Sequence, residues 1–410
     1  MKEIWLFTMR YPFGEGEAFL ENELPVLCER FERVRLFPLE RVGTARTLPP
    51  NAEVAPLQLG VYDRLSPFDL LLRYGTFRKL ARSLRNEAPS MEAFRAQWPE
   101  LRSRIRYLLQ RAKVLGAEVE RHYDPSTTLL YSYWTHDWAT VLSILRQRDR
   151  RLRCISRAHG FDLYADRGKN GWLPFRALHL EQLERIFCAS QAGLDHLRTQ
   201  HPQHGQRFEL ARLGTQDRGL ASWSPSGTLR LVSCANLVPL KRVDLLVEAL
   251  RGISTPVEWT HFGDGPERAR LEAAIATLPA NIQATLHGPI RNADLLAWYQ
   301  RTPVDLFVHT SASEGGVPVA LQEAASFGIP LLGIDAGGVR EIVNTGTGVL
   351  LPADAGALAL RDALQAHAGS VFASAAGRAG VRAFWNANFR ADVNFQRFCD
   401  RLIALDGPNA

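Results

Sequence analysis

Residues 313–343, SEGGVPVALQEAASFGIPLLGIDAGGVREIV, decide the fold of this chain. Glu314 and a glycine pair come just before Pro318, and an apolar helical run that contains Glu323 follows. Proline suits the first helical position because its missing N–H would be unsatisfied there, so we expect a helix that begins at Pro318. The free amides and partial positive charge at a helix N-terminus favour phosphate.

The second half of this stretch predicts a strand and another glycine loop. Residues 327–330 end the predicted helix, and residues 331–334 are expected to form a buried strand. Gly337 and Gly338 follow that strand. Because glycines let backbone amides approach a ligand closely, the stretch predicts a diphosphate cradle flanked by two carboxylates. An ordinary strand–loop–helix crossover of an α/β domain is the alternative.

The stretch resembles the donor-site signature of retaining GT-B glycosyltransferases of the large family 4. That signature reads E-G-x-P-x(4)-E-A, followed by G-x-P and D-x-G-G-x-x-E. The resemblance implies that Glu314 contacts the donor sugar and acts in catalysis, and that Glu323 holds the ribose. The two glutamates are nine residues apart here rather than eight, so the extra residue falls in the glycine loop. The other donor-binding residues that this stretch implies are Gly315, Gly316, Val317, Pro318, Gly337 and Gly338.

Residues 233–250, SCANLVPLKRVDLLVEAL, resemble the segment where the family places an Arg and then a Lys on the donor diphosphate. Lys241 matches the lysine, and Asn236 stands where the arginine is expected. Arginine would give a bidentate phosphate contact that asparagine does not provide. Arg242 is a candidate substitute. The loop that corresponds to the nucleobase side contains Pro289, Ile290 and Arg291.

Two segments of the first half resemble the sugar and acceptor side of the family. His159, in SRAHGFDLY, matches the histidine of R-x-H-G-x-D-x-Y, which implies a catalytic place beside the transferred sugar. The loop with Gly14, Gly16 and Glu17 is similar to Y-P-x-G-x-G-E openings in family 4 enzymes of polysaccharide assembly. These three residues and Arg157 are the acceptor-side candidates. A tight strand-to-helix turn with exposed acids is the alternative for the loop.

Apolar strands alternate with amphipathic segments along the chain, which predicts an α/β fold with parallel sheets. Residues 214–228 are rich in Gly, Ser, Thr and Pro and read as a linker. We expect an acceptor-binding domain at 1–213, a nucleotide-sugar-binding domain at 214–386, and a C-terminal helix at 387–410 that packs back on the first. The resemblance implies the GT-B arrangement, two facing Rossmann-like domains with an interdomain cleft.

The charge of the chain is uneven. Its net charge is +6, with 33 Lys and Arg against 25 Asp and Glu in residues 1–212 and 16 against 18 in the remainder. The basic half suggests contact with an anionic surface. The arginine-rich residues 76–113 either lie on an anionic membrane surface or form a pair of solvated surface helices. No nucleic-acid-binding module is recognised, so nucleic acid is not an expected partner.

The amino-acid composition limits the classes of protein to which this chain can belong. The 410 residues are 46% hydrophobic and 22% charged, as in globular proteins. Five cysteines without a C-x-x-C pair favour a reducing compartment and argue against a disulfide framework or zinc site. No signal peptide and no apolar run of about 20 residues is recognised, so we expect a cytoplasmic location, peripheral to the membrane at most. No D-x-D motif or Cys/His cluster indicates a metal, and no cofactor is expected.

The resemblance implies a retaining glycosyltransferase, and the lack of a recognised metal motif indicates that it is metal-independent. It would move a hexose-type sugar from a nucleotide-sugar donor to a glycan or lipid-linked acceptor, in surface polysaccharide assembly. No carboxylate nucleophile is recognised, so front-face attack assisted by the departing phosphate is expected. A nucleotide-sugar epimerase on the same fold and a catalytically degenerate partner subunit are the alternatives.

Overall fold

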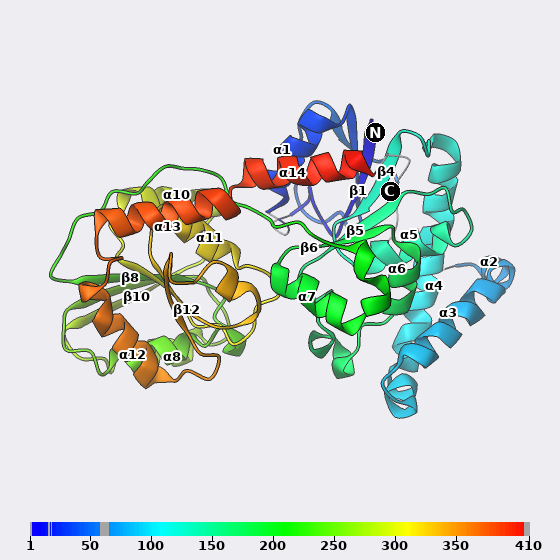
Figure 1. The fold of residues 1–410 in the computed structure, drawn as a ribbon. Helices are drawn as coiled ribbons and strands as arrows, with labels where there is room; N and C mark the ends of the chain where they lie inside the picture. The colour runs from blue at the N-terminus through cyan, green and yellow to red at the C-terminus, as the bar shows by residue number, and fades with distance from the viewer. Residues whose placement is uncertain (1, 15–16, 18, 58–64, 406–410) are drawn as a thin grey trace. The chain divides into compact units, whose positions relative to one another are not determined.

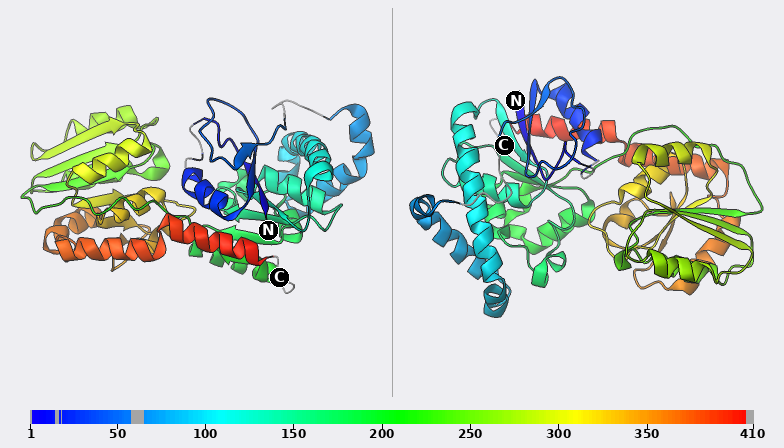
Figure 2. Two further views of the ribbon diagram at one scale, coloured as in Figure 1. Left: turned by 90° about the horizontal axis from the view of Figure 1, so that it is seen from above. Right: turned by 180° about the vertical axis from the view of Figure 1, so that it is seen from behind.

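The chain forms two compact units, each built around its own parallel sheet (Figure 1). The computed structural model describes residues 2–14, 17, 19–57 and 65–405. Unit 1 comprises Met1–Ala211 and Phe395–Ala410, and unit 2 comprises Arg212–Asn394. Helices cover the faces of both sheets (Figure 2). The predicted α/β class with two Rossmann-like domains is therefore confirmed.

The sheet of unit 1 has the strand order β3-β2-β1-β4-β5-β6-β7, and every pairing is parallel. The direction of strand addition reverses at β1, between β2 and β4, so ligands are expected at the carboxyl ends of these strands. The strands are β1 (Glu3–Thr8), β2 (Arg33–Pro38), β3 (Ala52–Val54), β4 (Thr128–Ser132), β5 (Cys154–Ala158), β6 (Arg185–Cys188) and β7 (Phe208–Leu210).

The helices of unit 1 follow the predicted alternation, with a long helical insertion between β3 and β4. They are α1 (Leu20–Arg30), α2 (Pro67–Leu72), α3 (Tyr74–Glu87), α4 (Met91–His122), α5 (Asp137–Arg146), α6 (Arg176–Gln182) and α7 (Gln191–Gln200), with 3-10 helices η1 (Ala165–Arg167), η2 (Lys169–Gly171) and η3 (Pro202–Arg207). Ser90 caps α4, because its side chain accepts a hydrogen bond from the backbone N–H of Ala93.

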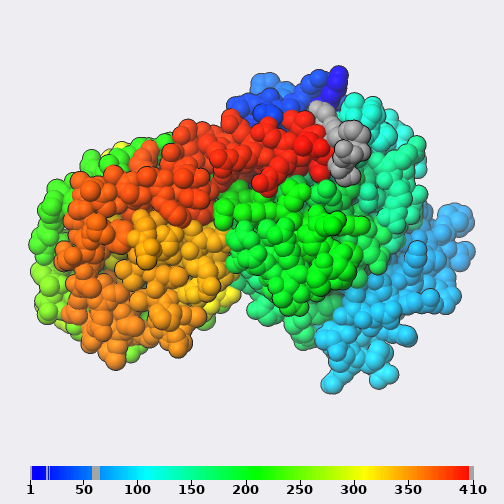
Figure 3. All heavy atoms as spheres, viewed as in Figure 1, coloured from blue at the N-terminus to red at the C-terminus, as the bar shows by residue number. Residues whose placement is uncertain are grey.

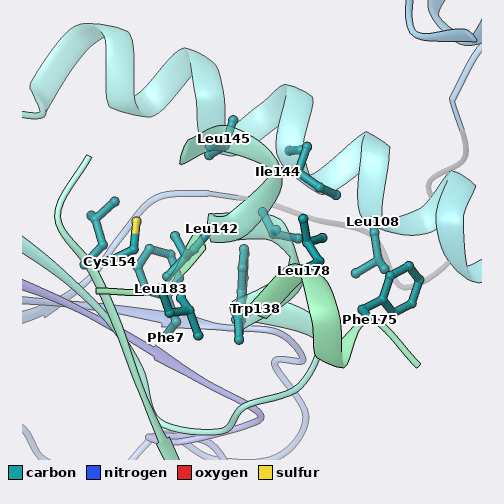
Figure 4. Close-up of a cluster of buried hydrophobic side chains, with 14 of the residues drawn as sticks. Phe7, Leu108, Trp138, Leu142, Ile144, Leu145, Cys154, Phe175, Leu178 and Leu183 are labelled. Carbon is teal, nitrogen blue, oxygen red and sulfur yellow. The ribbon is translucent and has the colours of Figure 1, made fainter. Parts of the chain in front are cut away.

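Helix α5 lies at the centre of the unit 1 core, between the sheet and α4 (Figure 4). Trp138 of α5 packs against Phe7 of β1 with ring centroids 5.0 Å apart, and its indole N–H donates to the Thr8 carbonyl at 3.1 Å. Leu108 of α4 and Leu178 of α6 belong to the same buried cluster. This packing fixes the start of α5, and so the loop between β4 and α5.

The sheet of unit 2 has the order β10-β9-β8-β11-β12-β13, again with only parallel pairings. Its reversal point lies at β8, between β9 and β11. The strands are β8 (Leu229–Cys234), β9 (Val257–Phe262), β10 (Ile282–Gly288), β11 (Leu306–His309), β12 (Leu331–Ile334) and β13 (Gly348–Leu351). The helices are η4 (Pro239–Lys241), α8 (Val243–Leu250), α9 (Arg268–Ile275), α10 (Asn292–Arg301), α11 (Val319–Ser326), η5 (Gly337–Glu341), α12 (Ala357–Ala366), η6 (His367–Gly369) and α13 (Ala375–Asn388).

The C-terminal helical segment is broken rather than continuous. Helix α13 ends at Asn388, and α14 (Ala391–Ala404) begins after Phe389, whose N–H bonds back to the Trp385 carbonyl. The later part of α14 belongs to unit 1, where Phe398 packs on Tyr131 with ring centroids 5.5 Å apart.

The helix predicted at Pro318 begins one residue later. Pro318 has φ −57° and ψ 128°, so it is the N-cap residue and α11 starts at Val319. The end of the helix is as expected, because Phe327 is the C-cap and Gly328 adopts a φ of 73°.

Candidate functional site

The carboxylate of Glu314 is held by two basic side chains of unit 2. Lys241 at the end of η4 donates from Nζ to Glu314 Oε1, and His309 at the end of β11 has Nε2 3.1 Å from the same oxygen. Burial alone would raise the pKa of Glu314, but the contacts with His309 and Lys241 lower it to about 2. Glu314 is therefore an ionised group at neutral pH, able only to accept hydrogen bonds.

The topology of the sheet brings these three residues together. Strands β8 and β11 are neighbours at the reversal point, and their carboxyl ends lead into η4 and the Glu314 loop. The hydroxyl of Thr310 donates to the Lys241 carbonyl at 2.8 Å, and the N–H of Ala312 donates to the Leu240 carbonyl at 2.9 Å. These bonds tie the two loops to each other and fix the position of the lysine.

The two glycine pairs form one tightly packed cradle. A Cβ atom on Gly337 would lie 1.8 Å from the Glu314 carbonyl oxygen, and one on Gly338 would lie 2.5 Å from the Gly316 carbonyl group. Gly337 also has φ 55°, a conformation that favours glycine. Only glycine allows this approach of the two loops.

The loop from Gly315 to Pro318 leads from Glu314 into α11. Val317 is buried and packs in the hydrophobic core of unit 2, and its carbonyl accepts from Gln322 Nε2 at 2.9 Å. The first amides of a helix have no carbonyl partner within the helix. In α11 these amides directly follow the glycine loop that forms one side of the cradle. This arrangement suits an anionic group.

Glu323 lies on α11 and is 8% exposed. Asn292, the first residue of α10, donates from Nδ2 to Glu323 Oε1 at 2.7 Å. Burial raises the pKa of Glu323 to about 7, although the bond from Asn292 lowers it. The predicted nucleobase-side residues directly precede Asn292: Pro289 and Arg291 are exposed and Ile290 is half-buried.

Glu323 is expected to make the folded state less stable as the pH rises. Its pKa rises from an ordinary 4.5 to about 7 on folding. Its stabilising contribution is therefore complete below about pH 4.5 and is lost as the pH rises through 7, a change of about 3 kcal/mol. Chemical denaturation at pH 5 and pH 8 should show this loss in the parent protein and a smaller one in Glu323→Gln. Equal losses in both proteins would contradict the prediction.

Asn236 and Arg242 occupy different surroundings near the cradle. Asn236 is exposed on the loop after β8. This loop packs closely on the turn after β9, because a Cβ on Gly263 would lie 1.9 Å from the Ala235 carbonyl oxygen. Arg242 Nη2 donates to the Ala355 carbonyl at 2.8 Å. The guanidinium of Arg242 is thus tied to the loop before α12, which weakens its candidacy as a substitute phosphate ligand.

In unit 1, His159 follows β5 and packs against two aromatic rings. Its ring centroid lies 4.7 Å from that of Tyr133 and 4.3 Å from that of Trp134. Its backbone is fixed by Asp162, whose Oδ1 accepts from the His159 N–H at 2.8 Å. The side chain is 12% exposed, and its Nδ1 lies 3.8 Å from Asp162 Oδ2. Nε2 has no hydrogen-bond partner among the described residues. Nε2 is therefore the candidate ring nitrogen for contact with a ligand.

Glu17 braces the loop after β1. Its carboxylate accepts from the backbone N–H groups of Met9, Arg10 and Tyr11 at 2.7–3.1 Å and from Trp134 Nε1 at 2.6 Å. With four donors bound, this carboxylate serves the loop itself, as in the alternative of a tight turn.

Of the two candidate glycines of this loop, the structure describes one, Gly14. Gly14 adopts φ 63°, and its N–H donates to the Thr44 carbonyl at 3.2 Å. Gly16 lies outside the described residues.

Arg157 does not reach the surface, and its acceptor-side role stays a prediction. It is 0% exposed, and Nη1 donates to Glu23 Oε2 at 2.5 Å. Its guanidinium carbon lies 4.1 Å from the ring centroid of Phe398 in α14. This buried ion pair links the end of β5 to α1 and α14.

Sequence reasoning missed His309 and Asn292. His309 ends β11 five residues before Glu314, and an apolar run that ends in a histidine was a usable signal because strand ends carry site residues in parallel sheets. Asn292 precedes Glu323 by 31 residues, and only the folded sheet brings the two together. Within the described ranges, no group of three or more His, Cys, Asp or Glu residues is placed to hold a metal ion.

Comparison with known proteins finds glycosyltransferases that are similar to part of this chain. Residues 222–366 match the family model "Glycosyl transferases group 1". A GDP-mannose-dependent alpha-mannosyltransferase of Mycobacterium tuberculosis (strain CDC 1551 / Oshkosh) is 31% identical over 189 residues, 44% of this chain and 47% of that protein. The amylovoran biosynthesis glycosyltransferase AmsK of Erwinia amylovora is 30% identical over 139 residues, 32% of this chain and 34% of that protein. The matched segments thus span less than half of each relative.

The solved structures agree with the fold. Sucrose-phosphate synthase (tll1590) from Thermosynechococcus elongatus superposes with a TM-score of 0.72 at 16% identity, over 99% of each chain. Its likeness shows the fold alone. The two Rossmann-like domains of this chain are those of the GT-B fold.

Proposed function

We propose that this chain, which carries a glycosyl transferases group 1 domain, is a retaining glycosyltransferase of family 4. It transfers a sugar from a nucleotide-sugar donor to a glycan or lipid-linked acceptor, without a metal ion. Unit 2 binds the donor, and unit 1 binds the acceptor. The similar GDP-mannose-dependent alpha-mannosyltransferase supports a hexose donor, and the similar amylovoran biosynthesis glycosyltransferase supports a role in polysaccharide synthesis. Our proposal assigns this role to surface polysaccharide and to the cytoplasm.

The observation that carries this proposal is the assembly of Glu314, Lys241 and the paired glycine loops at the reversal point of the unit 2 sheet. The loops present backbone amides, and Lys241 adds a positive charge. Together they suit the diphosphate of a nucleotide sugar. Glu314 is ionised and supplies acceptor atoms for sugar hydroxyls.

The same groups fit the departure of a nucleoside diphosphate. Negative charge grows on the diphosphate as the bond to the sugar breaks, and preorganised amides and Lys241 stabilise it. The acceptor hydroxyl then attacks the same face of the sugar from which the diphosphate leaves, so the anomeric configuration is retained. In this proposal His159 of unit 1 contacts the reacting sugar, and Glu323 binds the ribose.

Product analysis tests this function. The full chain is incubated with UDP-glucose or GDP-mannose, with and without an extract of lipid-linked acceptors, in buffer with EDTA. A transferase releases the nucleoside diphosphate and labels the acceptor only when both substrates are present. Conversion of the donor in the absence of acceptor would instead establish the epimerase. Donor binding without any reaction would favour the degenerate subunit.

Membrane contact by the arginine-rich residues 76–113 does not come from the apolar side chains of α4. The apolar residues of α4, including Leu101, Ile105 and Leu108, are buried in unit 1, so they do not reach a membrane. Helix α2 and the start of α3 lie at the surface of unit 1 (Figure 3). They expose four large apolar side chains. These residues, which we call the α2 patch, are between 53% and 71% exposed: Phe68, Leu71, Leu72 and Tyr74.

We propose that the α2 patch binds anionic membranes peripherally. Arg78, Lys79, Arg82 and Arg85 are exposed on the adjoining helix α3. Apolar side chains inserted at the interface, with basic side chains at the lipid phosphates, are the features of peripheral binding. Among the described residues, no helix is both long enough and apolar enough to span a bilayer.

Polar substitution in the α2 patch is expected to release the protein from membranes. The double variant Leu71→Ser/Leu72→Ser should lose most of its flotation with vesicles that contain anionic lipid, because it removes two exposed leucines worth roughly 1.5–3 kcal/mol each. Leu358→Ser, which changes an equally exposed leucine in unit 2, is the matched control. Equal flotation of the double variant and the parent protein would refute membrane binding by this patch.

A further inference from the structure

Glu323 is a buried carboxyl group of unit 2 without a basic partner. It is 8% exposed, and its Oε1 accepts one hydrogen bond, from Asn292 Nδ2 at 2.7 Å. Among the described residues, no Lys, Arg or His forms an ion pair with Glu323, and nothing donates to its Oε2. Burial of an ionised carboxylate with a single neutral donor is costly, so such a group takes up a proton.

Glu314 in the same unit has the opposite surroundings. Although burial acts against its ionisation, its contacts with His309 and Lys241 lower its pKa to about 2. Burial raises the pKa of Glu323 to about 7. Glu314 is therefore ionised throughout the neutral range, whereas protonated and ionised Glu323 coexist in that range. The two carboxyl groups differ because only Glu314 has basic side chains beside it.

The other ionisable groups on the elements around α11 are neutral or engaged elsewhere. They are Cys234 of β8, Tyr299 of α10, His309 of β11, and Arg378 and Arg382 of α13, while β12 has none. Burial raises the pKa of Cys234 to about 12 and that of Tyr299 well above its ordinary value, so both stay neutral. His309 is bound to Glu314, and the two arginines donate to backbone carbonyl groups. Among Glu323, Cys234 and Tyr299, only Glu323 exchanges a proton near neutral pH.

Asn292 orients the Glu323 carboxyl group without fixing its charge. It is the first residue of α10, and its side chain is exposed. Its amide is neutral at every pH, so the bond to Oε1 favours the ionised form of Glu323 only modestly, unlike the bond from Lys241 to Glu314. Since Asn292 is exposed, the pair lies next to solvent, which can receive a proton.

A ribose ring distinguishes the two forms of this carboxyl group. Two neighbouring ribose hydroxyls each donate a hydrogen bond, and an ionised carboxylate only accepts, so it satisfies both hydroxyls and Asn292. A protonated carboxyl group places a donor of its own at the same position, and it lacks the charge that strengthens these bonds. The ribose therefore binds the ionised form of Glu323 more tightly than the protonated form.

We propose that Glu323 releases a proton when it binds the ribose of a nucleotide sugar, and that Asn292 is the positioning residue for this exchange. The O–H bond of the carboxyl group breaks, the proton passes to solvent, and the carboxylate accepts the ribose hydroxyls. The inference rests on the proposed function in taking ribose as the ligand of Glu323. It makes nucleotide-sugar binding by unit 2 dependent on pH.

Nucleotide-sugar affinity at pH 6 and pH 8 tests the proposal. The probes are UDP-glucose and GDP-mannose, titrated into the full chain. Their phosphates are diesters that keep the same charge at both pH values, unlike the terminal phosphate of a free nucleoside diphosphate. Affinity follows the ionised fraction of Glu323, so one of the two probes should bind about tenfold more tightly at pH 8 than at pH 6. Equal affinity at the two pH values would overturn the proposal.

Calorimetry at pH 7 counts the proton. The heat of binding in Pipes and in imidazole buffer should differ by the ionisation heat of roughly half a proton released per bound nucleotide sugar. Glu323→Gln has no proton to release, so its binding should show neither this difference nor the change in affinity between pH 6 and pH 8. A Glu323→Gln protein that keeps the pH dependence of the parent would assign the proton to another group and overturn the proposal.

Asn292→Ala tests the positioning role. Without the amide bond the pKa of Glu323 rises further, so the midpoint of the affinity curve should move to a higher pH. A residue that only braces α10 would instead weaken binding by the same factor at every pH. Asn386→Ala, at an exposed asparagine of α13, is the matched control and should keep the parent curve. An unmoved midpoint in Asn292→Ala would overturn the role of Asn292.

Carbon-13 NMR of the free protein, labelled at its glutamate carboxyl groups, separates this inference from the proposed function. One resonance that is absent from Glu323→Gln should titrate near pH 7 without any nucleotide. If that resonance titrates near the ordinary 4.5, the inference fails, while nucleotide-sugar binding leaves the proposed function standing. If neither nucleotide sugar binds at pH 6 or pH 8, the proposed function fails, and the release of a proton to ribose fails with it.

Discussion

Glu314→Gln is expected to lower kcat for sugar transfer by about 100-fold. The parent carboxylate is ionised, with a pKa of about 2, and is held by Lys241 and His309. Glutamine keeps the shape of the side chain but has no negative charge. The hydrogen bonds that Lys241 and a sugar hydroxyl donate to this side chain are therefore weaker in the variant. Hydrogen bonds to charged groups contribute about 1.5–3 kcal/mol each, and about 2.7 kcal/mol corresponds to 100-fold in rate.

Steady-state kinetics with the donor varied at saturating acceptor measures this effect. Glu248→Gln, at an exposed position on α8 of the same unit, is the matched control and should keep the parent rate. A Glu314→Gln enzyme with a parent-like kcat would show that Glu314 only braces its loop. A fall in donor affinity with kcat unchanged would give Glu314 a binding role without a catalytic one.

Glu23→Gln is expected to destabilise the protein by about 3–5 kcal/mol. Glu23 and Arg157 are both fully buried, and the carboxylate also accepts from the Tyr131 hydroxyl at 3.2 Å. Removing one partner of a buried ion pair leaves the other charge without compensation, which is the costly change. The loss should appear as a lower denaturation midpoint in urea.

A double variant and an exposed pair provide the controls. Glu23→Leu combined with Arg157→Met removes both charges and should recover much of the lost stability. Asp400→Asn breaks the exposed pair with Arg30 in the same unit and should cost less than about 1 kcal/mol. If Glu23→Gln were as stable as Asp400→Asn, the buried pair would not stabilise the fold, and the structural role of Arg157 would be refuted.

The sequence predicted the parts of the fold that depend on local pattern. Apolar runs such as residues 331–334 became strands, and the Gly-Ile-Pro sequence after α11 ended that helix as expected. The start of α11 was misplaced by one residue, because proline fixes φ but leaves ψ free, and Pro318 takes an extended ψ as the N-cap.

The parts of the site that depend on tertiary contact were not predictable. Arg157 was an acceptor-side candidate from its motif with His159, and its ion-pair partner Glu23 lies 134 residues away on α1. The ring of His309 meets Glu314 only because β11 ends beside the η4 loop. In each case the sequence indicates a residue at the end of a strand, but only the folded chain shows which side chain it contacts.

Calorimetric titration of UDP and GDP into the full chain and its Gly338→Ala variant tests the central claim most directly. A Cβ on Gly338 would lie 2.5 Å from the backbone of Gly316, so the variant must open the cradle. Gly380→Ala, where a Cβ meets nothing within 4 Å, is the matched control in α13. The account predicts that one nucleoside diphosphate binds the parent and Gly380→Ala alike and binds folded Gly338→Ala at least about tenfold more weakly, since close approach of the loops is what presents the amides. Equal binding by folded Gly338→Ala, or no binding of either nucleotide to the parent, would contradict a nucleotide-sugar site in unit 2.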